Sequence, residues 1–369
     1  YSNTTGNDCT AVGHEALKVN TTGERNTAVG RDALTATTGG NDNTAVGEGA
    51  LESNTTGSDN VAIGRNALEG NTTGGKNHGI GRQALFLTTT GEDNTSVGYQ
   101  SLYNNTTGDY NTAVGMYALY TQSTANQITA IGYKAGYKNT AAQNTFIGSY
   151  AGEWNTTGSD NVYIGFQAGY NSTGGYQNVS VGKGALYSVT TAYNNTAIGK
   201  HSLNLATTGH SNTCIGEASG AVITTGDGNT CLGKAAGLAI TTGTNNITIG
   251  EDAGRSNSPS GDITTGSNNV VLGNNSISNL YCADTSISSS DARDKTDVED
   301  FKYGLSWITE LRPVTYRWDR RTWYGTEENP KGTPDGSKKR DRIHIGFLAQ
   351  EAIEVEKKHG YADTKDNML

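Results

Sequence analysis

The chain of 369 residues has few of the residue types that build compact enzyme domains. Hydrophobic residues make up 33% of it and aromatic residues 8%, and it holds only 4 cysteines, 4 prolines and 6 histidines. So few cysteines, with no C-x-x-C pair, exclude a disulfide framework and a cysteine-rich zinc site. The scattered histidines form no Ser-His-Asp arrangement. We therefore expect no metal and no cofactor.

Charge and hydropathy exclude two classes of partner. The formal net charge of −9 argues against nucleic acid or an anionic membrane surface as the main partner. No apolar run reaches the length of a membrane span, and no signal peptide is visible. Because Tyr1 lies in the middle of a repeat, we expect the chain to be a fragment without its anchoring amino-terminal region.

Glycine is abundant, with 50 residues, and it is periodic. A pair of one aliphatic residue and one glycine recurs every 17 residues from Val12-Gly13 to Ile249-Gly250. The spacing slips to 16 between Gly132 and Gly148, which we expect to fall in a corner, and it opens to 23 before Gly273, which indicates an insertion at 256–262. So strict a period indicates one structural unit stacked many times.

Each repeat has the same internal order. A strand of the form N-T-A-[VI]-G is followed by Ala-Leu or Ala-Gly and then by a turn written N-T-T-G. This order predicts two short strands and two corners per coil of an all-β parallel β-solenoid, or β-roll, of about 16 coils. Stacking like on like predicts an amide ladder of the Asn four residues before each glycine, at 26, 43, 60, 94, 111, 144, 161, 178 and 195. One strip of aliphatic side chains per coil is a poor core, so lateral association is expected.

The units N-T-A-V-G-x-x-A-L and N-T-F-I-G-S-Y-A-G resemble the head repeats of trimeric autotransporter adhesins. The resemblance covers residues 3 to about 273. It implies left-handed parallel β-rolls that pack as a homotrimer.

Aromatic residues occupy one position of the repeat, five residues after the glycine, in the middle third of the chain. They are Phe86, Tyr103, Tyr120, Tyr137, Tyr170 and Tyr187, interrupted by Glu153. Flat rings with hydroxyl tips suit glycans, so this aromatic ladder is a candidate binding site for a host glycan or receptor. An aromatic ladder can equally stabilise the solenoid or seal a subunit interface, and both readings stay open.

The composition changes near residue 290. Residues 290–369 hold 31 charged residues out of 80, against 32 out of 289 before them. Their pattern predicts a helix at 297–311, strands at 314–318 and 343–348, and a helix at 349–358, a small α+β unit. We assign a solenoid to 1–273, a connector to 274–289 and a separate domain to 290–369.

This last domain carries three motif blocks, S-D-x-R-x-K from Ser290, L-R-P-V-x-Y-x-W from Leu311 and G-F-L-A-Q-E from Gly346. They resemble the endosialidase-type intramolecular chaperone of phage tail spikes and fibres. The resemblance implies a domain that assists trimerisation and then cuts itself off between Ser289 and Ser290. It makes Ser290 the nucleophile and Lys295 its base, a single-turnover serine endopeptidase. The family continues beyond the last block, whereas this chain ends at Leu369, so we expect the domain to be truncated.

A Ser-Lys dyad is chemically reasonable, because packing that desolvates a lysine amine lowers its pKa and makes it a base. Five residues apart, the two do not share a helix face, so the dyad needs a turn or a pairing across subunits. A surface lysine and a helix-capping serine are the structural alternatives.

These observations together favour a virion tail fibre or tail spike, extracellular and homotrimeric, that attaches to a host and joins other tail proteins through its missing amino-terminal region. A spike that degrades polysaccharide on its solenoid and a bacterial trimeric surface adhesin are the two alternatives. Degradation would require two carboxylates about 5–9 Å apart, and the acids of the repeats form no unique cluster.

Overall fold

A computed structural model describes residues 2–279, 310–316, 337, 344–346 and 348–358. The chain divides into two compact units, Tyr1–Tyr281 and Cys282–Leu369. Each unit is described by itself.

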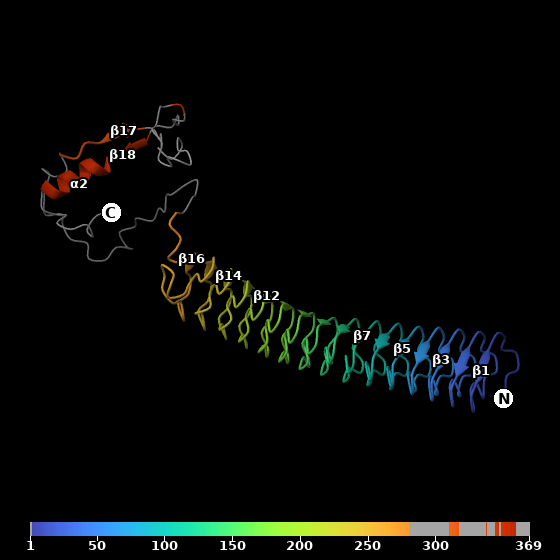
Figure 1. Cartoon of the computed structure of the whole chain (residues 1–369). Helices are drawn as coiled ribbons and strands as arrows, with labels where there is room; N and C mark the ends of the chain where they lie inside the picture. Colours follow the sequence, from blue (N-terminus) through green and yellow to red (C-terminus); the bar gives the residue numbers. More distant parts are fainter. Residues whose placement is uncertain (1, 280–309, 317–336, 338–343, 347, 359–369) are drawn as a thin grey trace. The chain divides into compact units, whose positions relative to one another are not determined.

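The first unit is a solenoid whose coils follow one another along a rod (Figure 1). One three-residue strand per coil pairs in parallel with the strand of the next coil, which makes a single sheet of 16 strands in sequence order. The strands are β1 (Thr10–Val12), β2 (Thr27–Val29), β3 (Thr44–Val46), β4 (Val61–Ile63), β5 (His78–Ile80), β6 (Thr95–Val97), β7 (Thr112–Val114), β8 (Thr129–Ile131), β9 (Thr145–Ile147), β10 (Val162–Ile164), β11 (Val179–Val181), β12 (Thr196–Ile198), β13 (Thr213–Ile215), β14 (Thr230–Leu232), β15 (Ile247–Ile249) and β16 (Val270–Leu272).

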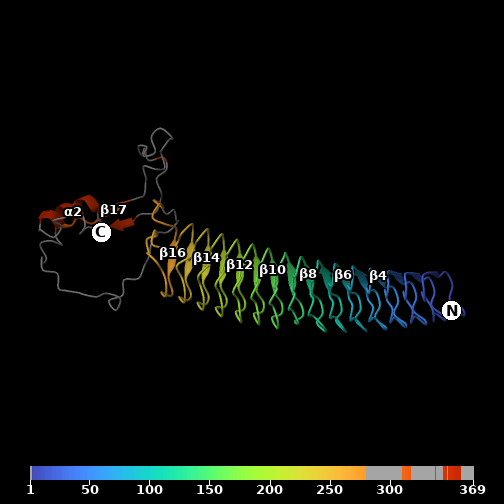
Figure 2. The ribbon, with the colours of Figure 1, turned by 60° about the horizontal axis from the view of Figure 1, so that its bottom comes forward.

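The predicted all-β parallel solenoid of about 16 coils is thus confirmed, and every coil closes within one chain (Figure 2). The prediction of two strands per coil is wrong, because each coil holds one. After the strand the backbone enters the left-handed region twice, as at Asp32 (φ 58°) and Leu34 (φ 50°). Two such residues so close together curl the chain into successive turns, so it cannot continue as a pleated strand.

The aliphatic residue before each glycine faces outward, contrary to the prediction that it forms the core. In most strands the central residue is buried and its two neighbours are not, as in β3, where Ala45 is buried and Val46 is exposed. Successive residues of a strand point to opposite sides, so a buried alanine in the middle forces both neighbours outward. The core consists instead of that central residue and the Ala-Leu or Ala-Gly pair that follows the glycine.

The core is filled in two ways. Nine coils bury a leucine four residues after the glycine, and the central residue of their strand is always alanine, glycine or serine. Six coils have glycine at that position, and five of these have a larger central residue: Phe146, Tyr163, Cys214, Cys231 or Thr248. A Cβ added to Gly152 would lie 2.4 Å from the ring of Phe146, and one added to Gly169 would lie 2.3 Å from the ring of Tyr163. The glycine therefore makes room for the large neighbour.

The predicted amide ladder is confirmed. Asn60 Nδ2 donates to Asn43 Oδ1 at 3.1 Å and to the carbonyl of Gly74 at 2.9 Å, and its backbone N–H donates to the same Asn43 Oδ1 at 3.0 Å. The same bonds recur with the 17-residue spacing, and the asparagines are buried. The ladder thereby satisfies polar groups inside the solenoid.

The slip of the period falls in a corner and the wider spacing is an insertion, as predicted. Asn139 donates to the carbonyl of Ala141, two residues on, where Asn105 reaches Gly108, three residues on, so the N-T-T-G corner is one residue shorter there. At the insertion, the N–H of Ile263 donates to the carbonyl of Gly254, which closes the extra loop. The strands on either side remain in register, with Ile247 opposite Val270.

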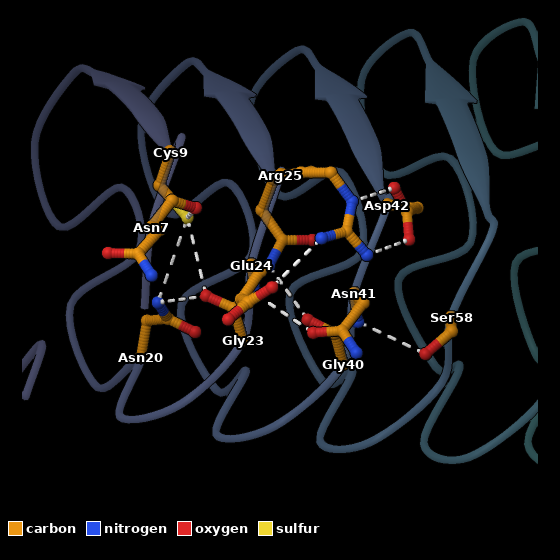
Figure 3. A network of polar contacts seen from close by, with 11 residues as sticks. Asn7, Cys9, Asn20, Gly23, Glu24, Arg25, Gly40, Asn41, Asp42 and Ser58 are labelled. Atoms are coloured by element: carbon orange, nitrogen blue, oxygen red, sulfur yellow. Dashed lines mark hydrogen bonds and ion pairs between the residues drawn. The ribbon is translucent and has the colours of Figure 1, made fainter. Parts of the chain in front are cut away.

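Polar contacts also join neighbouring coils on the outside (Figure 3). Asn41 Oδ1 accepts the backbone N–H of Glu24 at 2.8 Å, and Ser58 Oγ accepts that of Asn41 at 3.0 Å. Beside them, Arg25 forms a two-pronged pair with Asp42. These contacts follow the repeat, so they are structural in character.

In the second unit, β17 (Val314–Tyr316) and β18 (His344–Gly346) pair in an antiparallel manner, and α2 spans Ala349–Lys358. These elements confirm the predicted second helix, the first three residues of the strand predicted at 314–318 and the middle of the strand predicted at 343–348. The predicted helix at 297–311 lies almost wholly outside the described residues.

Candidate functional sites

The residues of the predicted cleavage site lie outside the described residues. Ser289, Ser290 and Lys295 belong to that part of the chain. Their roles stay predictions.

The structure joins the other two motif blocks. Val314 of the second block pairs with Gly346 of the third in the β17–β18 ladder. Arg312 forms a two-pronged ion pair with Glu351 on α2, and its Nε lies 3.1 Å from Glu351 Oε2. The hydrogen bonds and charge of Arg312 lower the pKa of the Glu351 carboxyl. A second pair joins Lys358 to Glu310 at 2.8 Å. The sequence alone did not reveal this link, because the partners are 39 and 48 residues apart.

The predicted aromatic residues form stacks along the solenoid. The ring centroids of Phe86 and Tyr103 lie 5.0 Å apart with an interplanar angle of 13°, and Tyr103–Tyr120 and Tyr120–Tyr137 repeat this geometry at 5.2 Å and 15°. After the interruption at Glu153, Tyr170 and Tyr187 stack at 5.0 Å and 9°. Because each ring lies against the next, flat faces inside a stack are covered by neighbouring rings.

A second set of aromatic residues, one or two positions after the glycine, packs edge-on beside these stacks. Tyr117 meets Tyr120 at 5.7 Å and Tyr137 at 6.2 Å, and Tyr150 meets Tyr170 at 6.5 Å. Sequence reasoning missed this second set because its position alternates between coils. The signal available was the concentration of tyrosine in the middle third of the chain. The two sets together make one aromatic surface between residues 86 and 187.

The interruption of the ladder holds a buried ion pair. Glu153 is 4% exposed, and its Oε1 lies 3.4 Å from Lys134 Nζ. Its other oxygen, Oε2, is buried and has no hydrogen-bond partner in the described part of the chain. Burial alone would lower the pKa of Lys134, but the charge and hydrogen bond of Glu153 outweigh it and raise that pKa. Lys134 is therefore charged at neutral pH.

The rings around this pair are in contact with cations. Lys134 Nζ lies 5.2 Å from the centroid of Tyr137, 5.6 Å from that of Tyr133 and 5.9 Å from that of Tyr150. Lys138 also lies over Tyr137, at 5.2 Å. The pKa of Tyr170 is raised: Trp154 acts in the opposite direction, but burial and the charge of Glu153 outweigh it. The Tyr170 hydroxyl thus remains a neutral hydrogen-bonding group at neutral pH.

Within the described residues, one group of side chains has the proximity of metal ligands. His14, Glu15 and Asp32 place one ligand atom each within 4.8 Å of one another. They are exposed or half-buried, Lys18 pairs with Glu15 at 2.8 Å, and Arg31 pairs with Asp32 at 3.3 Å. Because both carboxylates already have cationic partners, this cluster gives no support for a metal site.

No helix in the described part of the chain is long and apolar enough to cross a membrane.

One protein-family model matches the carboxyl-terminal segment. Residues 290–361 match the family model described as chaperone of endosialidase. No curated protein and no solved structure matches the chain. A parallel β-solenoid followed by an endosialidase-type chaperone segment fits the architecture of a tail fibre or endosialidase-type spike.

Proposed function

We propose that this chain is the homotrimeric shaft of a virion tail fibre or tail spike that attaches to a host, and that its carboxyl-terminal chaperone cuts itself off after assembly. The observation that carries the proposal is the order of the two parts, a β-solenoid followed directly by a segment matching the endosialidase chaperone family. A chaperone at the end of a repetitive rod can set the register in which the copies associate. Sixteen nearly identical coils can pair out of register, and a distinct terminal domain can align the copies before the coils associate.

The proposed cleavage breaks the peptide bond between Ser289 and Ser290. Lys295, as the neutral amine, takes the proton from the Ser290 hydroxyl, whose oxygen attacks the carbonyl carbon of Ser289 to form an ester. The proton passes to the leaving amino group of Ser290, and water then hydrolyses the ester to leave a carboxylate on Ser289. The family match begins at residue 290, which is consistent with a boundary there.

Intact mass of the purified full-length chain tests the cleavage. Wild type should separate into fragments 1–289 and 290–369, whereas Ser290→Ala and Lys295→Met should stay whole. Ser288→Ala and Lys302→Met are matched controls that change the same residue types nearby and should be cut normally. If wild type remains uncut under native conditions, or if Ser290→Ala is cut like wild type, the proposed dyad is wrong.

The outer face of the long sheet supports association of copies. All 16 strands end in an outward aliphatic residue, and Val12, Ile63, Ile131, Ile215 and Leu272 are 39–57% exposed. This aliphatic stripe runs through all sixteen strands of the solenoid. A partner able to cover it must repeat at the spacing of the coils, about 4.8 Å, and a second copy of this chain has that period by construction. Three copies would bury the stripes against one another around an axis.

Native mass spectrometry tests this interface. The wild-type chain should be a trimer, and Ile131→Glu, which places a charge in the middle of the stripe, should weaken it at least tenfold. Leu205→Glu is the matched control, because Leu205 is 42% exposed but lies outside the stripe. A monomeric wild type, or an Ile131→Glu variant as trimeric as the control, would rule out the stripe as the interface.

A further inference from the structure

We infer that the aromatic surface of residues 86–187 binds an oligosaccharide, and that the buried carboxylate of Glu153, at the break of the ladder, accepts hydrogen bonds from its hydroxyl groups. This inference rests on the proposed function in host attachment and names the ligand and the place.

The solenoid does not need aromatic residues in the ladder position. Five residues after the glycine, the coils outside the aromatic surface carry chemically unrelated side chains: Lys18, Thr35, Glu52, Glu69, Asn204, Ala221, Leu238 and Arg255. The backbone of these coils keeps the same strand pairing. A copy-to-copy interface along the rod would also need its contact residues in every coil, as the aliphatic stripe has. The aromatic surface instead spans seven coils, roughly 29 Å at the strand spacing, as expected for a local binding site.

A ligand can reach only certain parts of the rings. Inside the stacks, neighbouring rings cover each other's faces, so edges and hydroxyl groups are presented outward. The stacks end at Tyr137 and Tyr170, on either side of Glu153, where stacking on the next ladder ring stops. Trp154 beside them is 44% exposed. A sugar ring combines apolar C–H faces with hydroxyl edges, and this mixed chemistry matches aromatic faces next to polar groups.

The state of Glu153 also supports a ligand at the break of the ladder. A carboxylate that is 4% exposed and uses one oxygen for Lys134 leaves its second oxygen without a donor in the described residues. A buried acceptor without a donor is destabilising, and more so when it is charged. Within the described residues, Glu153 also holds Lys134 through Oε1, and its charge raises the pKa of Tyr170. Sugar hydroxyl groups are donors of the right kind for the second oxygen.

The charges on the surface indicate the type of saccharide. Arg82 lies over Tyr99, Lys138 over Tyr137 and Lys183 over Phe166, all at 5.2–5.8 Å from the ring centroid, in addition to Lys134. Four cations thus contact the aromatic rings, and Glu153 neutralises one of them. The excess positive charge lies on a chain whose formal net charge is −9. We therefore expect acidic oligosaccharides to bind more tightly than neutral ones at low salt.

The test uses the full chain on an array of neutral and acidic bacterial surface polysaccharides, with affinities then measured for the strongest binder. Glu153→Gln, which keeps the size but removes the charge, should weaken binding about tenfold or more, and Tyr137→Ala should do the same. Leu238→Ala, at the equivalent position outside the aromatic surface, should bind like wild type. Melting temperatures of all variants identify any that bind poorly because they unfold. Tyr103→Phe, which keeps the ring and removes one hydroxyl, provides a variant expected to fold normally and to bind more weakly.

The inference is overturned if wild type binds no polysaccharide on the array, or if Glu153→Gln and Tyr137→Ala bind as tightly as Leu238→Ala. Adsorption of the same proteins to intact bacterial cells separates this outcome from failure of the proposed function. Cells that take up wild type and Glu153→Gln equally would leave attachment standing and remove the saccharide site. If wild type adsorbs to no strain and binds no glycan, both fail.

Discussion

Nine coils bury a leucine four residues after the repeat glycine (leucine coils), and six have a glycine there (glycine coils). The two kinds of coil have the same backbone fold but different cores. In a leucine coil such as that of Leu85, a large buried corner residue accompanies a small central strand residue, Gly79. In a glycine coil such as that of Gly152, the corner is empty and Phe146 fills the space from the strand. The difference shows that the interior of a coil can be filled from either side. The coil with Ala130 and Gly136 is small on both sides, and there the ring of Phe146 from the next coil lies against Gly136.

The two solutions differ in backbone strain. The leucines of the nine leucine coils have φ between 46° and 53°, in the left-handed region that glycine adopts freely. A residue with a Cβ costs roughly 1–2 kcal/mol there. Full burial of a leucine contributes about 1.5–3 kcal/mol, which offsets that cost. In the glycine coils the corner residue is a glycine, which adopts the left-handed region without this cost. No burial energy is needed there to offset backbone strain.

Adding a leucine to a glycine coil should have the largest effect. Gly152→Leu places a side chain where even a Cβ would lie 2.4 Å from Phe146. We expect a loss of unfolding free energy of about 3 kcal/mol or more, measured by denaturant titration. Adding Phe146→Ala should recover much of this loss, because the double variant has the composition of a leucine coil. If the two changes are simply additive, the volume coupling is wrong.

Removing the leucine from a leucine coil should cost slightly less. Leu85→Ala leaves a cavity in the core and should lower the unfolding free energy by about 2–3 kcal/mol. Leu85→Gly removes one more carbon but relieves the left-handed strain at φ 53°, so it should be no less stable than Leu85→Ala. Thermal unfolding of the two variants side by side measures this order. A glycine variant much less stable than the alanine variant would contradict the strain argument.

The amide ladder is shared by both kinds of coil, so its loss should have an intermediate and similar effect in each. Asn60→Ala, in a leucine coil, and Asn161→Ala, in a glycine coil, each leave a buried backbone N–H of the next coil without its side-chain acceptor. The carbonyls of Gly74 and Gly175 also lose an amide donor, and that of Gly74 keeps a second one from the neighbouring corner. We expect about 1–2 kcal/mol of destabilisation for each by denaturant titration. A large difference between them would mean that the core type also decides the strength of the ladder.

The smallest effect on stability should come from ion pairs on the outer surface of the coils. The hydrogen bonds and charge of Arg25 lower the pKa of Asp42 from 3.8, and the pair is exposed. Any stability from this lowered pKa is fully present above pH 3.8 and is lost as the pH falls through the lower folded value. Asp42→Asn should therefore leave the melting temperature at pH 7 nearly unchanged, because exposed ion pairs contribute little. A marked decrease would show that surface pairs hold the coils together as the core does.

In the carboxyl-terminal unit, local sequence signals were sufficient for the described elements. Pro313 precedes the alternating residues of β17, and the helix Ala349–Lys358 has acidic Glu351 in its first turn and lysines in its last. The link between Arg312 and Glu351 could not be predicted this way, because it depends on how the hairpin and the helix pack.

The sequence by itself determined what stacks on what in the solenoid. A 17-residue period places equivalent residues on neighbouring coils, so the asparagine ladder, the coil number and the positions of both irregularities could be read from spacing alone. Only the tertiary structure decided which way each side chain faces. Left-handed residues such as Asp32 and Leu34 interrupt the alternation of a strand, so spacing cannot tell inside from outside, and the aliphatic stripe was assigned to the wrong side. Contacts between unlike positions, such as Phe146 with Gly152 or Lys134 with Glu153, depend on side-chain volume and direction in three dimensions, which a repeat period does not specify.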